Sequence, residues 1–305
     1  YLMSIGIKLA ERGLASDTLI RGGIRKLLQE RLETISEDSR DPKVWIEHLE
    51  SVPLAVNTDA ANEQHYEIPA DYFRAVLGSH LKYSSGYWPN GNESLDQSEA
   101  AMLSLSCERA ELANGQRILE LGCGWGSLSL WMASNYPESS IVAVSNSNSQ
   151  REYIAEQSRK RGIDNLEVIT CDINQFQPAG GFDRVVSVEM FEHVRNHRQL
   201  LSQISGWLNP MGKLFVHIFT HRQHTYLFEQ KSDKDWMSKY FFTGGIMPAA
   251  DLLPTAADGL LKEEGRWVVN GKHYSRTLEA WLNKQDANKD AVMDTFVKCY
   301  GKHDA

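Results

Sequence analysis

The sequence predicts an α/β protein whose mostly parallel sheet is covered by helices on both faces. From Gly115 to about residue 220, short apolar runs alternate with helical stretches, which is typical of parallel strands joined by crossover helices. The first apolar run leads directly into a glycine-rich turn, as in folds that bind a ligand between a strand and the next helix. We expect this core to carry an N-terminal helical extension and a helical cap or insertion.

The composition is that of a chain with a large core. Of the 305 residues, 42% are hydrophobic and 24% are charged, and no run approaches the roughly 18 apolar residues of a membrane helix. Acidic residues outnumber basic ones 40 to 32, and the net charge of −8 argues against a nucleic-acid partner. The cysteines form no CxxC pair and the histidines no HExxH motif. We therefore expect reduced thiols, no bound metal and a cytoplasmic location.

Residues 1–60 are predicted to form a helical extension. Apolar residues recur every three or four positions through a charged segment, which favours a surface helix with one buried face. A helix on a membrane surface or a partner is the alternative. The apolar residues are Leu19, Ile20, Ile24, Leu27, Leu28, Leu32 and Ile35. A short helix around Trp45 follows, and residues 61–115 are expected to add helical segments, broken near residues 88–92, that contribute to the binding site.

Residues 116–220 are predicted to be the sheet core. We expect strands at 117–121, 141–144, 166–170, 184–188 and 213–219, with helices after the glycine-rich turn, at 149–161 and at 199–208. The sequence Pro210-Met211-Gly212 is expected to turn between the last helix and the last strand.

Residues 221–305 are predicted to form a substrate-cap insertion followed by final strands. The insertion runs from 221 to about 255, late strands are expected within Gly265–Val269, and a last helix is expected at Ser275–Asn283.

The glycine-rich turn has the sequence GCGWG at residues 122–126, two positions after Glu120. A dinucleotide site would instead have a GxGxxG turn and an acid at the end of the second strand, where this chain has Ser145-Asn146-Ser147-Asn148. Asp172 ends the third strand, where an adenine amino group is commonly accepted. The pattern resembles the class I S-adenosylmethionine (SAM) methyltransferases, which have a Rossmann-like sheet. Glu120 would then lie near the cationic end of SAM, and a nicotinamide site or a structural turn is the alternative.

Further motifs make the resemblance closer. They lie at 64–69 (QHYEIP), 82–85 (KYSS), 119–126, 189–193 (EMFEH), 240–248 and 269–274. From about residue 60 to 300 the chain resembles the coclaurine N-methyltransferase family of plant alkaloid enzymes, which is related to the cyclopropane fatty acid synthases. Members carry a further C-terminal helical segment that helps close the substrate pocket. The resemblance therefore implies that this chain, which stops at Ala305, is truncated at its C-terminal end.

The resemblance also implies which residues hold SAM. It assigns Tyr83 and Ser84 to the methionine part, Glu120, Gly122 and Gly124 to the loop beside it, Asn146 and Gln150 to the ribose, and Asp172 and Ile173 to the adenine. The product would be S-adenosyl-L-homocysteine.

Glu189, Glu192 and His193 follow the fourth strand directly, at the sheet edge where α/β folds bind ligands. If this segment turns helically, the three side chains share one face. Two carboxylates and an imidazole suit an amine, which is mostly protonated at pH 7 and must lose a proton before methylation. We predict that His193 is the base and that a carboxylate holds the ammonium, although the sequence leaves open which group takes the proton. The alternative is a solvated helix start.

Other residues are candidates for the substrate site. His217 and Tyr274 align with positions that hold bicarbonate in the cyclopropane synthases, whereas Ser85 stands where those enzymes have a cysteine. A strand histidine is more often a satisfied core group. The aromatic residues Trp88, Phe241, Phe242 and Trp267 could line a ring-accepting pocket with cation–π support, or belong to the core.

We therefore expect a SAM-dependent N-methyltransferase that acts on a small amine, of the benzylisoquinoline alkaloid type. The alternatives are a cyclopropane-synthase-like enzyme acting on an unsaturated acyl chain, and a non-catalytic SAM-binding protein. We expect no nucleic-acid partner and no stable membrane insertion, and we allow for a homodimer.

Overall fold

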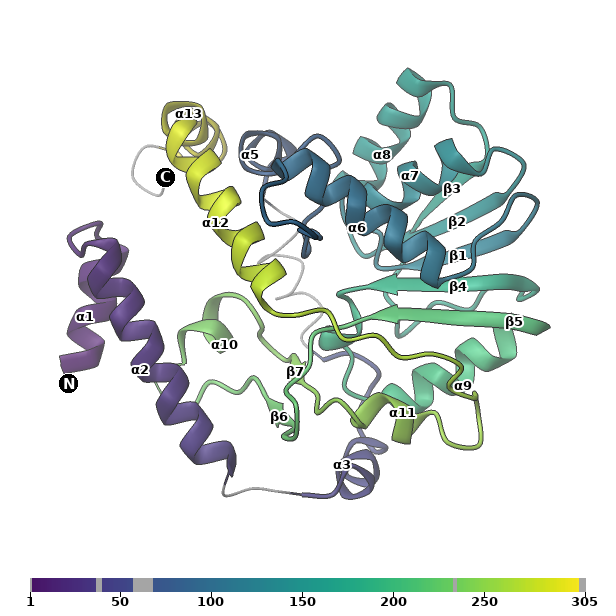
Figure 1. Cartoon of the computed structure of the whole chain (residues 1–305), viewed down its shortest axis with the longest axis horizontal. Helices are drawn as coiled ribbons and strands as arrows, with labels where there is room; N and C mark the ends of the chain where they lie inside the picture. The colour runs from purple at the N-terminus through teal and green to yellow at the C-terminus, as the bar shows by residue number, and fades with distance from the viewer. Residues whose placement is uncertain (1, 37–39, 57–67, 233–234, 302–305) are drawn as a thin grey trace. The chain divides into compact units, whose positions relative to one another are not determined.

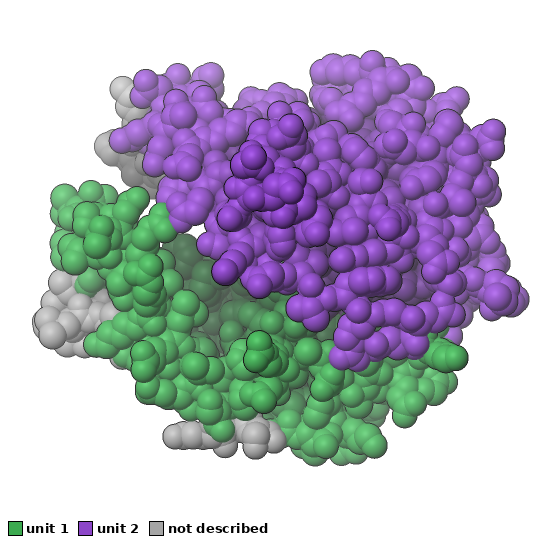
Figure 2. Space-filling model, in the orientation of Figure 1, with its two compact units in different colours: residues 1–61, 192–201, 219–262 green, residues 62–191, 202–218, 263–305 purple. Residues whose placement is uncertain are grey.

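The computed structural model describes residues 2–36, 40–56, 68–232 and 235–301. The chain forms two compact units (Figure 2). Unit 1 comprises Tyr1–Ala61, Glu192–Leu201 and Phe219–Lys262, and unit 2 comprises Asn62–Phe191, Ser202–Ile218 and Glu263–Ala305. Among the described residues, no helix combines the length and the apolar character needed to cross a membrane. The motif residues Gln64, His65 and Tyr66 lie outside the described residues.

Unit 2 contains the parallel sheet that the sequence predicts (Figure 1). Its strands are β1 (Arg117–Leu121), β2 (Ser140–Ser145), β3 (Leu166–Thr170), β4 (Phe182–Val188) and β5 (Leu208–His217), in the spatial order β3-β2-β1-β4-β5. All four neighbouring pairs are parallel. The order reverses between β1 and β4, so the carboxyl ends of these two strands flank the switch point at which open α/β sheets bind ligands.

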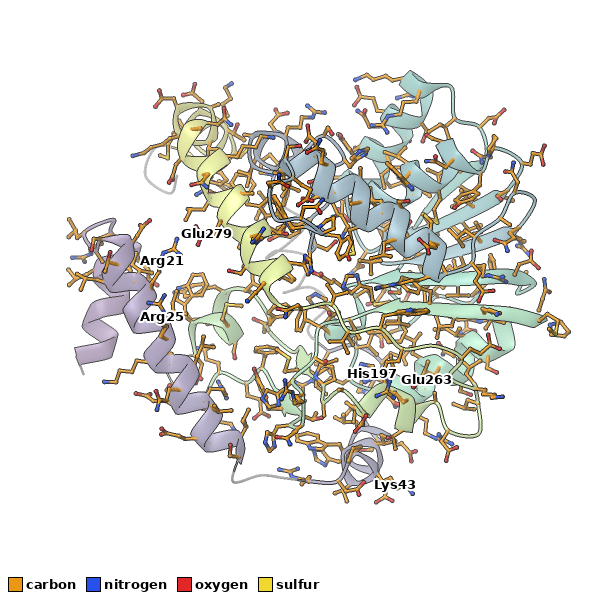
Figure 3. The ribbon with its side chains drawn as sticks, in the orientation of Figure 1. Arg21, Arg25, Lys43, His197, Glu263 and Glu279 are labelled. Atoms are coloured by element: carbon orange, nitrogen blue, oxygen red, sulfur yellow. The ribbon has the colours of Figure 1, made fainter. Side chains whose placement is uncertain are left out.

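Helices cover the sheet of unit 2 as the alternating pattern predicts. Helix α7 (Ser127–Asn135) and helix α8 (Asn148–Arg161) pack on β2 and β3, and α6 (Leu95–Arg109) packs on α7. Helix α9 (His197–Trp207) begins at His197, which is labelled in Figure 3. Its first residues belong to unit 1 and its last residues to unit 2. The main apolar core includes the buried side chains of Leu103, Ile118, Leu128, Met132 and Ile141.

A second apolar cluster of unit 2 joins segments that are far apart in the sequence. Helix α5 (Ala70–Val76) packs against both α12 (Lys272–Ala287) and α13 (Lys289–Tyr300). The fully buried Phe73 lies between the rings of Tyr83 and Trp125, at centroid distances of 5.0 and 5.2 Å. This cluster fixes the segment that leads to Ser85.

Unit 1 consists of short elements around a small core. It contains α1 (Leu2–Glu11), α2 (Asp17–Ser36), α3 (Pro42–Leu49), β6 (Tyr226–Leu227), α10 (Trp236–Tyr240), β7 (Ile246–Met247) and α11 (Leu252–Ala256). Strands β6 and β7 pair antiparallel. Helix α3 packs on α11, and Trp45, Leu49, Ile246 and Leu252 form the buried cluster. The short helix predicted around Trp45 is confirmed.

The prediction that the long N-terminal helix buries one apolar face is only partly right. Helix α2 forms, and Ile35 is buried, but Ile24, Leu28 and Leu32 are 49%, 62% and 51% exposed. These three residues are spaced four apart on the side of the helix that also carries Ile35, so only part of this apolar face is buried. Arg21 and Arg25 also project from this helix (Figure 3).

The last strand begins earlier than predicted. Instead of 213–219, β5 spans Leu208–His217, and the expected turn at Pro210–Gly212 lies inside it as an irregularity. A two-residue step on β4, from Phe182 to Arg184, faces a five-residue step on β5, so the extra residues bulge out of the ladder. Gly212 permits this because a Cβ there would meet the carbonyl oxygen of Phe182 at 2.8 Å.

The late strands expected within Gly265–Val269 do not form. Residues 261–270 have no regular secondary structure and are held by side chains instead. The Arg109 guanidinium lies 5.2 Å from the ring centroid of Trp267, which is 51% exposed. Glu263, labelled in Figure 3, accepts hydrogen bonds of 3.0 and 2.7 Å from Arg266.

The final helix is longer than predicted, and a second one follows it. Helix α12 extends beyond the expected Ser275–Asn283 in both directions, and α13 was not predicted. Helix α13 buries Val292 against the α5 cluster, where Phe296 stacks on Tyr72 at 5.2 Å.

Asn165 provides a test of the sheet's supporting loops. Its Nδ2 donates to the carbonyl oxygens of Ala133, Tyr136 and Ser139, at 3.3, 3.0 and 3.0 Å. We expect Asn165→Ala to lower the free energy of unfolding by about 1–3 kcal/mol, because it removes the side-chain donor from three carbonyl groups, two of which belong to the buried residues Ala133 and Ser139.

Chemical denaturation would measure this effect, with Asn135→Ala as the matched control. Asn135 is exposed, and its Nδ2 donates to the Trp131 carbonyl oxygen alone, so we expect a change within about 0.5 kcal/mol. Equal losses in the two variants would contradict the structural role given to Asn165.

Candidate active site

Glu189, the first residue after β4, has an unusual backbone conformation. Its φ of +49° lies in the left-handed region, which a residue with a side chain adopts rarely and at a cost of roughly 1–3 kcal/mol. Its N–H donates to the carbonyl oxygen of His217, the last residue of the neighbouring strand, at 2.8 Å. The strained turn re-aims the chain at the carboxyl edge of the sheet, next to the topological switch point.

The Glu189 carboxylate is bound from two sides. Oε1 accepts a hydrogen bond of 2.9 Å from the backbone N–H of Ser85, and Oε2 accepts one of 2.9 Å from the hydroxyl of Tyr274. These partners come from the segment before α6 and from α12, so three distant parts of the sequence meet at one carboxylate. Both bonds favour the charged form, because they donate to an anion.

The segment around Ser85 is itself fixed to α12. Thr277, which is fully buried, accepts hydrogen bonds of 3.0 Å from the Gly86 N–H and from the Trp88 indole N–H. Trp88 is therefore a buried supporting residue whose polar edge is already bonded. Gly86 has no room for a side chain, because a Cβ would meet Ser98 Oγ at 2.6 Å.

Opposing electrostatic effects act on Glu189. Desolvation raises the pKa of its carboxyl, whereas the nearby charge of Lys82 and the two hydrogen bonds lower it. Burial lowers the pKa of Lys82 to about 8 against the opposing effects of Glu189 and Glu99. Burial, together with Lys82 and Arg109, lowers the pKa of His217 to about 3, so this imidazole is neutral at physiological pH.

The glycine-rich turn touches the same edge of the sheet. Gly122 has a φ of +80°, and a Cβ there would meet Met190 Cγ at 2.6 Å, so a glycine is required where this loop packs against the residue after Glu189. A Cβ at Gly126 would meet Ile154 at 2.6 Å, whereas one at Gly124 would meet nothing within 4 Å. The loop therefore packs closely at its two ends and leaves open space at its middle, where a ligand can approach the backbone.

Glu120 lies under this loop and is 3% exposed. Its Oε2 accepts a hydrogen bond from the hydroxyl of Ser129, and burial raises the pKa of its carboxyl to about 7. A cationic ligand group above the loop would offset the loss of solvent and favour the ionised form.

The ends of β2 and β3 carry the residues that the sequence assigns to ribose and adenine. Asn146 and Ile173 are half-buried, and Gln150 is buried, with its Oε1 accepting a 2.6 Å hydrogen bond from Ser145 Oγ. Asp172 Oδ1 accepts hydrogen bonds from the N–H and Nδ2 of Asn174, at 2.8 and 2.9 Å, which orients this half-buried carboxylate at the end of β3.

Glu192 and His193 belong to unit 1 and lie in a short 3-10 helix, Phe191–His193. Glu192 is fully buried, and its Oε1 accepts a 2.8 Å hydrogen bond from the Phe219 N–H. The His193 ring stacks on Phe242 with a centroid distance of 5.3 Å. The alternative of a solvated helix start is wrong for these residues, because Glu192 is buried.

The expected single helical face is also wrong. The helical turn begins only at Phe191, and Glu189 precedes it with a left-handed backbone. The side chains of Glu189 and Glu192 are therefore held by separate hydrogen-bond networks, one in each unit.

Aromatic side chains gather around Phe242 in unit 1. Its ring lies 4.8 Å from Phe241, 5.4 Å from Phe219 and 4.9 Å from Phe228, and it is buried while Phe241 is half-buried. Within unit 2, Trp88 is buried whereas Trp267 is exposed.

The structure thus brings part of the predicted site together within unit 2. Ser85, Glu189, His217 and Tyr274 are linked by hydrogen bonds, and Tyr83 packs nearby on Phe73 and Trp281, at 5.0 and 5.5 Å. Sequence analysis missed Lys82 and Glu99 as parts of this site. The signal that could have found Lys82 is its place in the KYSS motif, where a lysine stands among residues of a buried segment.

Comparison with known proteins supports the same reading of the fold. The family model for mycolic acid cyclopropane synthetase matches residues 56–302. The chain is 37% identical to (S)-coclaurine N-methyltransferase of Thalictrum flavum subsp. glaucum, over 97% of this chain and 84% of that protein. It is 33% identical to pavine N-methyltransferase of the same plant, over 97% and 85%.

Solved structures agree. A crystal structure of coclaurine N-methyltransferase bound to N-methylheliamine and SAH matches with a TM-score of 0.94 and 35% identity, covering 99% of this chain and 89% of that one. The mycolic acid cyclopropane synthase CmaA1, complexed with SAH and CTAB, shares the fold at a TM-score of 0.69 and 21% identity, over 82% and 92%. With its parallel sheet, glycine-rich turn and motifs in place, the chain belongs to the coclaurine N-methyltransferase family, within the cyclopropane-synthetase-like class I SAM methyltransferases.

Proposed function

We propose that this protein transfers a methyl group from SAM to the nitrogen of a small amine of the benzylisoquinoline type. The observation that carries the proposal is the Glu189 carboxylate, fixed at the switch point of a fold that matches an N-methyltransferase along almost its whole length. A fixed carboxylate beside an open loop suits an ammonium group, which gains both charge attraction and a hydrogen bond.

The residues present fit SAM. The open middle of the glycine-rich turn, the carboxylate of Glu120 beneath it and the polar edge formed by Asn146 and Asp172 offer contacts for a cationic amino-acid end and a nucleoside. When bound, SAM supplies the methyl group as a sulfonium. We propose that Tyr83, Ser84, Glu120, Gly122, Gly124, Asn146, Gln150, Asp172 and Ile173 hold it.

The chain's own residues would then handle the proton of the amine. The Ser85 N–H and the Tyr274 hydroxyl donate hydrogen bonds that fix the Glu189 carboxylate. We propose that this carboxylate holds the substrate ammonium in the orientation needed for methyl transfer. We assign proton removal to His193, which follows Glu189 by four residues and is stacked on Phe242. Glu192 would add negative charge that attracts the substrate ammonium in the ground state as well as in the transition state.

The remaining candidate residues would shape the substrate site. We propose that Phe241 and Phe242 contact the aromatic part of the amine, and that Ser85, His217 and Tyr274 line its polar end. We also propose a cytoplasmic location, because Cys107, Cys123, Cys171 and Cys299 are all free thiols.

An assay with two substrate classes tests the proposal. We expect mass spectrometry to detect methylated product with amines such as coclaurine. We expect no cyclopropane product with vesicles of unsaturated phospholipid. Because Ser85 replaces the cysteine of the cyclopropane synthases, we expect the turnover of the amine to be unchanged when bicarbonate is removed or added. A cyclopropanated acyl chain detected by mass spectrometry would overturn the assignment.

The role of His193 can be tested by its pH–rate profile. We expect His193→Ala to lower kcat by roughly 10²–10⁴-fold at pH 7, and part of this loss to return at high pH, where solvent has already deprotonated the amine. His48→Ala, at an exposed position of α3, is the matched control and should leave the profile unchanged.

Glu192→Gln should separate charge from structure in the same assay, because the amide oxygen can still accept the Phe219 N–H. We expect it to raise KM more than it lowers kcat. A His193→Ala variant with wild-type kcat at neutral pH would show that this histidine is structural.

A further inference from the structure

Lys82 is a buried lysine that the proposed chemistry does not use. It is 2% exposed, and its Nζ donates to the Ser84 hydroxyl and, at 2.9 Å, to the carbonyl oxygen of Ser85. Both acceptors are neutral oxygens. An ammonium group removed from water needs negative charge nearby, since burying a charge is costly when it is not paired.

The Ser85 backbone connects Lys82 to Glu189. The carbonyl oxygen of Ser85 accepts from Lys82, while its N–H donates to Glu189 Oε1 at 2.9 Å. The cation and the carboxylate therefore bind the two polar groups of one residue. The backbone just before Lys82 is also strained, because Leu81 has a φ of +48°, so the chain is bent to bring this side chain inward.

Other charged groups face the pair from neighbouring elements. Glu99 on α6 is fully buried and accepts hydrogen bonds of 2.8 and 2.9 Å from the N–H groups of Gly78 and His80. The neutral His217 on β5 is affected by the charges of both Lys82 and Arg109 on α6, and Tyr274 donates to Glu189. Lys82 interacts with both acids, and the interaction with Glu189 is the stronger one.

We propose that Lys82 is a positioning residue for the methyl transfer: its buried ammonium keeps the Glu189 carboxylate ionised and holds the Ser85 N–H against it. This inference rests on the proposed function, in which Glu189 must be an anion to hold the substrate ammonium. A nearby opposite charge favours the ionised form of a carboxylate, and the charge of Lys82 lowers the pKa of Glu189. Without it, only the two hydrogen bonds would oppose the desolvation that raises the pKa of Glu189, and a protonated carboxyl gives no charge attraction to an ammonium.

The test removes the charge of Lys82 and measures the titration of Glu189 directly. Infrared difference spectroscopy of the whole protein follows the carboxyl band, which is assigned to Glu189 by its loss in Glu189→Gln. We expect Lys82→Met to move the midpoint of this titration upward by about 1–3 pH units. Lys82→Gln keeps donors for the Ser85 carbonyl but lacks the charge, and should give the same shift if Lys82→Met fails to fold.

Lys284→Met is the matched control. Like Lys82, Lys284 donates from its Nζ to a backbone carbonyl oxygen, in this case that of Leu77, and Lys284 is half-buried. It should leave the Glu189 midpoint within about 0.3 pH units of the wild type, since a change in charge at this position is screened by solvent. An equal shift in the control, or no shift in the Lys82 variants, would overturn the proposal.

The pH–rate profile with an amine substrate supplies a second measurement. In Lys82→Met the acid limb of kcat should move upward with the infrared midpoint, and kcat should recover at high pH. A pH-independent loss of kcat would show a merely structural role and contradict the proposal. If no amine is methylated by the wild type, the proposed function fails, while the infrared shift still decides whether Lys82 controls the charge of Glu189.

Discussion

The rest of the site depends on one carboxylate, that of Glu189, and on the two hydrogen bonds that Ser85 and Tyr274 donate to it. Glu189 leaves the sheet with a strained backbone, which persists only when the surrounding structure holds it in place. The two donors come from segments nearly 190 residues apart in the sequence, and each is fixed by its own packing. The carboxylate is therefore oriented before any ligand arrives, which lowers the reorganisation needed for binding.

The glycine-rich turn and this carboxylate are coupled through direct packing. Met190, the next residue after Glu189, fills the space beside Gly122, so the glycine-rich loop and the turn after β4 set each other's position. The close fit explains why a side chain at Gly122 cannot be tolerated, while the open space at Gly124 remains free for a ligand. The carboxyl ends of β1 and β4 are therefore held together, which suits the proposed two-substrate reaction because orientation supplies much of the rate of such a reaction.

The sequence predicted the sheet well because its signals are local. The predicted bounds of β1 to β4 agree with the observed ones to within a few residues, because apolar runs and the glycine-rich turn indicate where each strand lies. The features it missed depend on distant partners. The bulge in β5 arises from pairing with β4, the segment 261–270 is fixed by side chains rather than by a strand ladder, and α13 is explained by its packing on α5.

The site shows the same division. The motifs identified Glu189, Ser85 and Tyr274 through a family resemblance, but no sequence pattern gives the left-handed backbone of Glu189 or the hydrogen bonds between these residues. The KYSS motif contains Lys82 but gives it no role, and its burial and its hydrogen bond to the Ser85 carbonyl are known only from the structure. Charge interactions across a fold are set by tertiary packing, which single-sequence reasoning does not reach.

The most direct test of this account is the activity of Glu189→Gln, measured with SAH affinity on the same protein. Glutamine keeps the size of the side chain and an acceptor for Ser85, but it removes the charge. The account predicts that kcat/KM for the amine falls by roughly 10²–10⁴-fold, while calorimetry gives an SAH affinity within about threefold of the wild type. Turnover equal to that of the wild type would contradict the claim that an ionised Glu189 holds the substrate.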